Sequence, residues 1–186
     1  MYILTIFAGM IVVLIVGLWT LVPILHGVPW RPTKDGRIRK ALQMAGLKSN
    51  ENLYDLGSGD GRVLILAARE FGASGFGIEI GPVQVVLSNL LFFLNDISSK
   101  VRVRREDFYR SDLSEADVVF AYLTSDQAPR LQKQFERQLK YGARVVTISF
   151  DLPGWQPEAF DRDDLIFLYK MPPVMGDLSS FLGALK

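Results

Sequence analysis

The chain has 186 residues and a formal net charge of +1, with 21 Lys and Arg against 20 Asp and Glu. This balance excludes a polybasic nucleic-acid binder, an acidic disordered chain and a membrane protein with several spans. Cysteine is absent, which excludes disulfides, thiolate metal sites and cysteine nucleophiles. The single histidine, His26, leaves no histidine cluster for a metal, so we expect no metal site.

The first 25 residues are predicted to form one transmembrane helix. Residues 1–25 are almost entirely apolar, and every Lys, Arg, Asp and Glu of the chain lies at or after Arg31. A helix of this length reaches roughly 37 Å, which exceeds the hydrocarbon core of a bilayer at roughly 30 Å. As a core helix of a soluble domain it would need protein on every side, because it is apolar on all faces.

A cleaved signal peptide is the competing interpretation of this segment. The sequence argues against it, because there is no basic start, the apolar run is too long and no small-x-small cleavage site precedes Arg31. Five basic residues then follow closely, opposed only by Asp35; they are Arg31, Lys34, Arg37, Arg39 and Lys40. The positive-inside rule therefore predicts a single-pass protein with the following domain on the cytoplasmic side.

The rest of the chain alternates between helical and strand patterns. Residues 26–34 contain two prolines and are predicted to be a linker, residues 35–171 one domain, and residues 172–186 a C-terminal tail. Helices are predicted over residues 35–47, 62–71, 83–94 and 126–139. Strands are predicted over residues 52–56, 75–80, 101–105, 116–123, 144–150 and, as the last, 165–170. This alternation predicts an α/β fold whose parallel sheet is covered by helices on both faces.

A glycine-rich loop, Gly57-Ser58-Gly59-Asp60-Gly61, stands between the first strand of this domain and a helix. Ligands of such sheets bind at the carboxyl ends of the strands, where glycine lets the backbone approach closely. A dinucleotide site would need a third glycine where Arg62 stands, and the Gly-Lys-Ser/Thr of a P-loop is absent. Asp55 before the loop and Asp60 inside it favour a ligand with a cationic end over a pyrophosphate.

Two further carboxylates end neighbouring strands. Glu79 ends the second strand, the usual place of a carboxylate that accepts the two ribose hydroxyls of a nucleotide. Asp107 follows the third strand, where an acceptor could bind an adenine amino group. The sequence thus favours a nucleoside ligand that carries a positive charge.

These segments resemble the motifs of class I S-adenosylmethionine-dependent methyltransferases. The similar residues are, in order, 55–62, Gly77-Ile78-Glu79, Glu106-Asp107-Phe108 and 117–123. Residues 29–33 and 153–157 extend the resemblance to the small archaeal protein-lysine methyltransferases and their membrane-anchored mitochondrial relatives, which modify the ADP/ATP translocase and the c-ring protein of ATP synthase. The resemblance covers about residues 29–171 and implies a Rossmann-like class I methyltransferase sheet.

The resemblance implies S-adenosylmethionine as the cofactor and a set of residues that bind it. These residues are Thr33, Asp55, Gly57, Ser58, Gly59, Glu79 and Asp107. The glycines and Ser58 would pass close to the methionine part, with Asp55 and Thr33 near its amino-acid end. Glu79 would then hold the ribose and Asp107 the adenine.

Tyr122 is the candidate catalytic residue. It ends the fourth strand, where methyl acceptors usually lie in this class, and it would orient the acceptor nitrogen. Tyr122 and Thr124 are equally compatible with plain core or turn residues. Trp155 is expected to pack under a loop rather than to line the acceptor site.

The implied function is methylation of a lysine amine of a protein at or near the membrane. A lipid, quinone or other small-molecule acceptor would use the same cofactor motifs, and a catalytically inactive anchored module that retains the cofactor is a further alternative. A nucleic-acid amino-methylase would show Asn/Asp-Pro-Pro-Phe/Tyr after the fourth strand. This chain has Ala121-Tyr122-Leu123-Thr124 there, so a nucleic-acid partner is not expected.

The chain departs from the resembled family in two places. The helix over residues 83–94 is unusually apolar, and its spacing predicts six residues that face the sheet, namely Val83, Val86, Leu87, Leu90, Leu91 and Leu94. Val85, Phe92 and Phe93 would then point sideways or outward and form a contact surface for a bilayer or a partner. The connection between Trp155 and Leu165 is short, which predicts a curtailed sixth strand.

Overall fold

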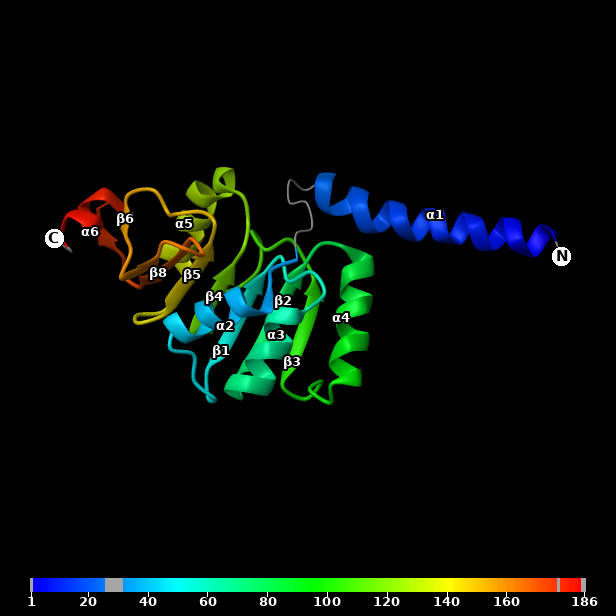
Figure 1. Ribbon diagram of the computed structural model, residues 1–186, viewed down its shortest axis with the longest axis horizontal. Helices are drawn as coiled ribbons and strands as arrows, with labels where there is room; N and C mark the ends of the chain where they lie inside the picture. The colour runs from blue at the N-terminus through cyan, green and yellow to red at the C-terminus, as the bar shows by residue number, and fades with distance from the viewer. Residues whose placement is uncertain (1, 26–31, 177, 185–186) are drawn as a thin grey trace.

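The computed structural model describes residues 2–25, 32–176 and 178–184. Residues 26–31 of the predicted linker, which include His26 and Arg31, lie outside the described residues, as do three residues of the predicted tail. The helical elements are α1 (Tyr2–Leu25), α2 (Asp35–Met44), α3 (Arg62–Leu66), the π-helical turn η1 (Ala67–Phe71), α4 (Pro82–Leu94), the 3₁₀ turn η2 (Ser125–Gln127), α5 (Ala128–Gln138) and α6 (Leu178–Ala184). Figure 1 shows α1 extending away from the globular part, at the end opposite to α6.

Seven strands form one sheet in the order β3-β2-β1-β4-β5-β8-β7. Their bounds are β1 (Asn52–Leu56), β2 (Ser74–Glu79), β3 (Val101–Arg105), β4 (Val118–Ala121), β5 (Arg144–Ile148), β7 (Ala159–Asp161) and β8 (Ile166–Lys170). The first five strands of this order are parallel, so their carboxyl ends meet at one edge. The sheet is mixed, because the two remaining strands, β8 and β7, are paired antiparallel.

The prediction of an all-parallel sheet is wrong at one edge. β8 runs antiparallel to β5, and the three-residue β7 runs antiparallel to β8. The connection from β7 to β8 is short, and a short connection suits an antiparallel pair, whereas a parallel pair needs a crossover. The three-residue β7 is the curtailed strand that the short connection predicts. The strand at residues 166–170, β8, is not the last one of the chain, because a further strand follows it. β9 (Val174–Met175) pairs with β6 (Trp155–Gln156) in a separate two-stranded sheet.

Helices cover both faces of the large sheet, as predicted. On one face, α2, α3, η1 and α4 bury a cluster that includes Leu42, Leu64 and Phe92 against the sheet. On the other face, α5 buries Leu131 and Phe135. All four residues of the central strand β4 are buried, which is typical of a parallel strand covered on both sides.

The predicted orientation of α4 is wrong for Val86, Leu90, Leu94 and Phe92, whereas Phe93 is exposed as predicted. Its buried residues are Gln84, Ser88 and Phe92, while Val86, Leu90, Phe93 and Leu94 are exposed. Two polar side chains face inward because each finds a hydrogen-bond partner there. The Ser88 hydroxyl donates to the Gly59 carbonyl at 2.8 Å, and Gln84 Nε2 donates to the Trp19 carbonyl at 2.9 Å. Hydropathy alone favours apolar residues at the buried positions and so does not identify Gln84 and Ser88 as buried.

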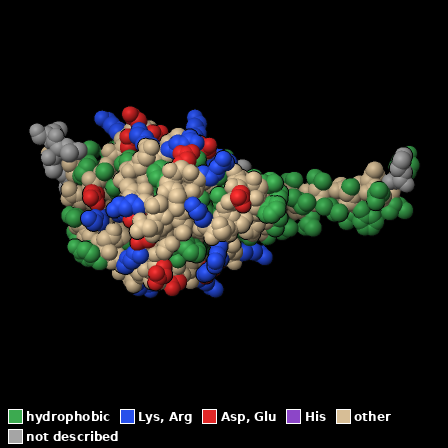
Figure 2. Space-filling view, turned by 90° about the horizontal axis from the view of Figure 1, so that it is seen from below, with side chains coloured by type: hydrophobic (Ala, Val, Ile, Leu, Met, Phe, Trp, Pro, Cys, Tyr) green, Lys and Arg blue, Asp and Glu red, His purple; other side chains and the backbone are tan. Residues whose placement is uncertain are grey.

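α1 is a candidate transmembrane helix. Its window Tyr2–Trp19 has a mean hydropathy of 2.5, and no part of the window is buried in the structure. Among the described residues it is the one helix long and apolar enough to cross a membrane. Figure 2 shows hydrophobic side chains along its whole visible length.

Candidate active site

The glycine loop connects β1 to α3 at the carboxyl edge of the sheet. The amides of Gly57 and Ser58 both donate to the Ile78 carbonyl of β2, at 2.9 and 3.1 Å. Gly57, Gly59 and Gly61 all have positive φ, a region that a residue with a side chain rarely adopts. The loop therefore turns back sharply and lies across the end of β2, next to Glu79.

α4 packs against this loop. A Cβ added to Gly61 would lie 2.5 Å from Cε1 of Phe92, so the backbone at this position packs directly on the aromatic ring. The hydroxyl of Ser88 holds the Gly59 carbonyl at 2.8 Å. Sequence reasoning missed Ser88 and Phe92, because a serine and a phenylalanine within an apolar helix give no signal of a contact with a distant loop.

Glu79 lies at the centre of the site. Its Oε2 accepts a hydrogen bond from the Gly59 amide at 2.8 Å, and its Oε1 accepts one from the Gly81 amide at 2.7 Å. The side chain is buried, and burial raises the pKa of the Glu79 carboxyl, while the amides of Gly81, Gly59 and Ile80 act to lower it. Each carboxylate oxygen retains a further lone pair that can accept a hydroxyl proton of a ligand.

Asp55 and Ser58 carry buried polar atoms that lack a partner among the described residues. These atoms are Oδ2 of Asp55 and Oγ of Ser58. Burial raises the pKa of the Asp55 carboxyl well above its ordinary value, and the nearby carboxylates of Glu79 and Asp60 raise it further. Because buried polar atoms are normally satisfied, these two unpartnered acceptor atoms beside Glu79 fit a ligand that carries a cation and hydroxyl or amine donors. S-adenosylmethionine has all of these groups.

Thr33 lies beside the loop and is attached to it through Arg62. Arg62 Nη1 donates to the Thr33 carbonyl at 3.0 Å, while its Nε and Nη2 bind the Asp60 carboxylate at 3.0 and 2.6 Å. The side chain of Thr33 is buried. The sequence predicts that the Asp60 carboxylate, inside the loop, favours a cationic ligand. Its carboxylate is instead paired with Arg62, so Asp55 and Glu79 remain as the buried acidic pair.

Asp107 and Tyr122 follow the two strands that flank β1 and β2. Asp107 is half-buried after β3, and its Oδ1 accepts a hydrogen bond from the Tyr109 amide at 3.0 Å. Tyr122 is half-buried after β4, two residues before Thr124, whose buried Oγ1 has no partner among the described residues. Because β1 to β4 are parallel, the structure brings these residues to the same edge as the glycine loop.

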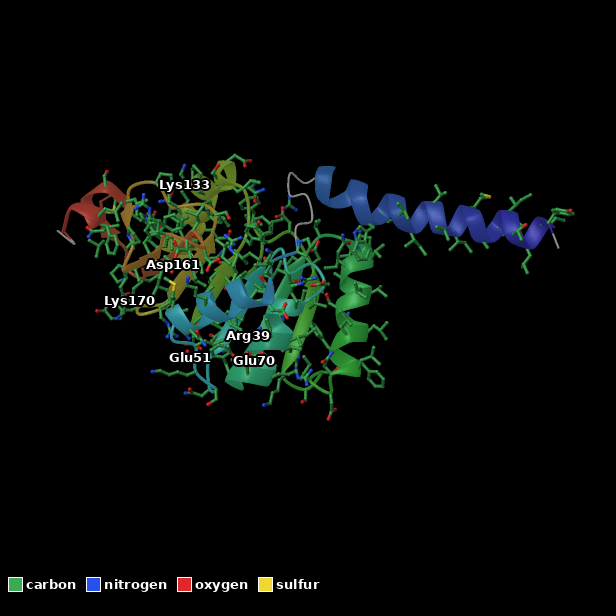
Figure 3. All side chains as sticks on the ribbon, in the orientation of Figure 1. Arg39, Glu51, Glu70, Lys133, Asp161 and Lys170 are labelled. Carbon is green, nitrogen blue, oxygen red and sulfur yellow. The ribbon has the colours of Figure 1, made fainter. Side chains whose placement is uncertain are left out.

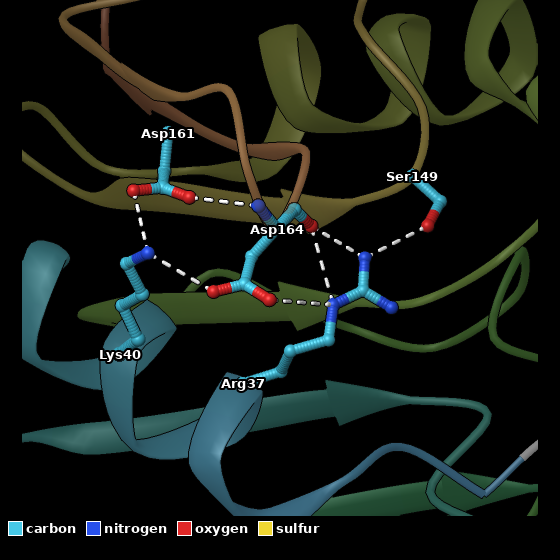
Figure 4. A network of polar contacts seen from close by, with 5 residues as sticks. All are labelled: Arg37, Lys40, Ser149, Asp161 and Asp164. Carbon is cyan, nitrogen blue, oxygen red and sulfur yellow. Dashed lines mark hydrogen bonds and ion pairs between the residues drawn. The ribbon is translucent and has the colours of Figure 1, made fainter.

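A polar network holds the start of α2 over Tyr122. The guanidinium carbon of Arg37 lies 5.5 Å from the centre of the Tyr122 ring. Arg37 also donates to the Asp164 carbonyl and, through Nη2, to Ser149 Oγ at 3.0 Å (Figure 4). One turn further along α2, Lys40 Nζ lies 2.7 Å from an Asp161 carboxylate oxygen and 3.0 Å from one of Asp164. These contacts join α2 to the loop between β7 and β8.

Sequence reasoning missed Arg37 as a neighbour of the candidate catalytic residue. The two residues are far apart in the chain, and no motif marks Arg37 within its helix. Trp155, by contrast, packs as expected. It is buried and makes an edge-to-face contact with Tyr169, whose ring centre lies 5.9 Å away. Among the described residues, no group of three or more His, Asp or Glu side chains could hold a metal ion.

The chain is similar to known methyltransferases in sequence. The model of the ANTKMT methyltransferase domain matches residues 55–159. A protein-lysine N-methyltransferase of Saccharolobus islandicus is 33% identical over 70% of this chain and 82% of its own length. The adenine nucleotide translocase lysine N-methyltransferase of Mus musculus is 32% identical over 74% of this chain, which spans 60% of that relative.

A solved structure gives the same result for the fold. An RNA methyltransferase from Salinibacter ruber, in complex with S-adenosyl-L-homocysteine, is 34% identical and superposes with a TM-score of 0.75. The superposition covers 79% of this chain and 97% of that one. Together with the matched domain model and the archaeal relative, it identifies the chain as a member of the ANTKMT methyltransferase domain family and as an S-adenosylmethionine-dependent methyltransferase.

Proposed function

We propose that this methyltransferase transfers a methyl group to a lysine side chain of a protein at or near a membrane. The observation that carries the proposal is the similarity to lysine-specific enzymes. The archaeal relative is a protein-lysine N-methyltransferase, and a second group is named for lysine N-methylation of the ATP synthase c-ring protein and of the adenine nucleotide translocase. The chain spans 57 to 60% of the length of the Xenopus and mouse proteins in that group.

In this proposal the residues at the carboxyl edge bind the cofactor. Glu79 accepts hydrogen bonds from the ribose hydroxyls through the lone pairs that the Gly59 and Gly81 amides leave free. Asp107 accepts a hydrogen bond from the adenine amino group. The unpartnered atoms of Asp55 and Ser58 support binding of the amino-acid end and the adjoining methionine part, with Thr33 alongside. When bound, S-adenosylmethionine supplies the methyl group as a sulfonium.

Tyr122 and Arg37 form the acceptor side of the site. A lysine ammonium has an ordinary pKa near 10.4 and must lose its proton before its nitrogen can attack. The positive charge of Arg37 above the Tyr122 ring disfavours the ammonium form of an entering lysine and favours the neutral amine. The Tyr122 hydroxyl then orients this nitrogen, and the residues position the reactants rather than supply a dedicated base.

We further propose that residues 1–25 anchor the enzyme in a membrane by a single span, with residues 26–34 as a linker, residues 35–171 as the catalytic domain and residues 172–186 as a tail. The apolar, unburied window of α1 supports the anchor. The basic residues after it support a cytoplasmic catalytic domain through the positive-inside rule.

One observation favours RNA as a second candidate acceptor. The Salinibacter structure is described as an RNA methyltransferase, and its identity to this chain is 34%. The sequence after β4, Ala121-Tyr122-Leu123-Thr124, supports a protein acceptor instead, because it lacks the Asn/Asp-Pro-Pro-Phe/Tyr motif of nucleic-acid amino-methylases.

Acceptor identity is tested by supplying the full chain, in native membranes that lack its activity, with isotopically labelled S-adenosylmethionine. Protein, lipid and RNA fractions are then counted separately, and labelled proteins are digested and sequenced by mass spectrometry. We expect label on lysine nitrogen of a membrane-associated protein, and none with the Glu79→Ala variant. Label in the lipid or RNA fraction would assign a different acceptor, and binding of cofactor without any transfer would identify an inactive module.

A further inference from the structure

The outer face of α4 is apolar and uncovered. Val86, Leu90, Phe93 and Leu94 recur at helical spacing, and 69, 52, 75 and 67% of their surfaces are exposed. They lie opposite to the buried face formed by Gln84, Ser88 and Phe92. We name these four residues the α4 stripe. The helix itself is well packed, because Ser88 and Phe92 of its inner face contact the glycine loop.

This stripe differs from the surfaces of the other helices that cover the sheet. No charged residue occurs between Gly81 and Asn95, whereas α2 and α5 carry Lys, Arg, Asp or Glu along their exposed sides. Clustered exposed apolar side chains usually mark a contact site. An exposed apolar helix face beside a candidate membrane span is suited to contact with lipid.

The first turn of α4 contacts the end of the candidate membrane span. Gln84, in the first turn of α4, is fully buried and donates from Nε2 to the carbonyl of Trp19 at 2.9 Å. Trp19 is the last residue of the apolar window of α1. In Figure 1, α4 runs crosswise to α1, and Figure 3 shows side chains of α4 that point to the side on which α1 extends. One bilayer boundary would therefore meet the end of the span and the length of α4 together.

We propose that α4 is an interfacial helix that docks the catalytic domain on the lipid bilayer, with the α4 stripe inserted at the boundary between headgroups and acyl chains. The inference rests on the proposed anchor formed by α1.

Docking through α4 also fixes where the active site lies. The inner face of the helix holds the Gly59 carbonyl through Ser88 and supports Gly61 through Phe92. The cofactor loop is thus separated from the proposed lipid surface by the thickness of a single helix. An acceptor lysine close to the membrane surface would be within reach without movement of the domain away from the bilayer.

The absence of cysteine in the chain permits a direct test. Three single-cysteine variants of the full chain, Phe93→Cys, Leu14→Cys and Lys133→Cys, are labelled with an environment-sensitive fluorophore and reconstituted into vesicles of zwitterionic lipid with an anionic fraction. Leu14 lies within α1, and Lys133 is an exposed residue of α5 that serves as the matched control. Retained binding of S-adenosylhomocysteine verifies the fold of each variant. Quenching by nitroxide-labelled lipid is then compared with quenching by aqueous iodide.

We expect lipid quenching of the label at position 93 to exceed that at position 133 about twofold or more, with a blue-shifted emission, because an interfacial helix enters the headgroup boundary by roughly 5–10 Å. Equal lipid quenching at positions 93 and 133, with strong quenching at position 14, would refute the docking of α4 and leave the anchor intact. Absence of lipid quenching at positions 14 and 93 would refute the α1 anchor and the docking of α4 together. A blue shift at position 93 without lipid quenching would mean that the label contacts protein, namely a second copy of this chain, and would overturn the proposal.

Discussion

The Gly59 amide donates a 2.8 Å hydrogen bond to the carboxylate of Glu79, which lies twenty residues later in the chain. This bond joins the glycine loop to the end of β2, so the loop that approaches the cofactor and the carboxylate proposed to hold its ribose form one unit. The Gly81 amide occupies the other oxygen of Glu79 at 2.7 Å. The carboxylate is thereby oriented before any ligand binds, and its orientation is fixed by backbone rather than by mobile side chains.

Glu79→Gln is expected to weaken binding of S-adenosylhomocysteine about 10- to 100-fold, because a hydrogen bond to a charged group contributes roughly 1.5–3 kcal/mol. The amide retains one acceptor oxygen but turns a donor toward either Gly59 or Gly81. Calorimetric titration of the full chain measures the effect. Glu51→Gln is the matched control, since Glu51 pairs with Arg144 at 2.6 Å at the opposite edge of the sheet. Equal affinities for the two variants would remove Glu79 from the cofactor site.

Gly61→Ala is expected to destabilise the protein by about 1–3 kcal/mol, as overpacking of a filled core does. The new Cβ would lie 2.5 Å from Phe92, and φ at this position is +78°. Gly142→Ala separates the two causes, because Gly142 has φ of +81° but nothing within 4 Å of its added Cβ. Chemical denaturation should show the larger loss for Gly61→Ala, and Phe92→Leu in the same chain should recover part of it. Similar losses at both glycines would mean that backbone strain alone explains the requirement.

The sequence predicts where strands begin and end better than it predicts which face of a helix is buried. β1 and β3 have the predicted bounds, because each is a short segment with aromatic or β-branched residues that lies between turn residues. The buried face of α4 is predicted incorrectly, because Ser88 and Gln84 are buried by partners that lie far away in the chain. The pair β6 and β9 has two residues in each strand, too few to show any periodicity.

The candidate site divides in the same way. The backbone of the glycine loop and the acidic strand ends could be placed from the sequence, because a parallel sheet brings the ends of β1 to β4 to one edge. The position of Arg37 over Tyr122 could not, since it depends on how α2 crosses the sheet and on the Asp164 carbonyl that fixes the guanidinium. Long-range contacts of this kind leave no mark in local sequence.

The Asp55 carboxyl is expected to make stability and cofactor binding depend on pH in opposite directions. Its pKa is raised well above 3.8 by burial, so the folded protein binds this proton more tightly than the unfolded chain does. The stability that Asp55 contributes is therefore complete below about pH 3.8 and is lost as the pH rises through the pKa of the folded state. A cationic ligand favours the ionised carboxylate, so its affinity should rise over the same range.

Asp55→Asn is the variant that tests this coupling. We expect its free energy of unfolding to depend less on pH than that of the natural chain, and its affinity for S-adenosylmethionine to be weaker at neutral pH. Titration in two buffers of different ionisation enthalpy should also show fewer protons released on binding. Glu79, whose pKa is raised in the same direction by burial, accounts for the dependence that remains. Identical pH profiles for the two proteins would mean that Asp55 does not titrate on binding.

Arg37 is expected to act as a positioning residue for the acceptor side. Arg37→Gln removes the cation over the Tyr122 ring together with the contacts to Asp164 and Ser149, so the ring and the entering amine lose a fixed neighbour. Because small misplacements of reactants are costly, methyl transfer under saturating cofactor should fall about 10- to 100-fold while cofactor affinity stays unchanged. Single-turnover transfer to the membrane acceptor, with parallel calorimetric titration, measures both quantities.

Two variants separate positioning of Tyr122 from simple attachment of α2. Lys40→Gln breaks the ion pairs of the same helix with Asp161 and Asp164 but leaves the Tyr122 ring untouched, so it should lower stability more than transfer. Arg37→Lys retains the charge near the ring but loses the planar guanidinium that donates to Asp164 and Ser149 at once, so it should recover only part of the rate. If Lys40→Gln slows transfer as much as Arg37→Gln does, the network matters only because it attaches α2 to the β7–β8 loop, and the contact between Arg37 and Tyr122 has no separate role.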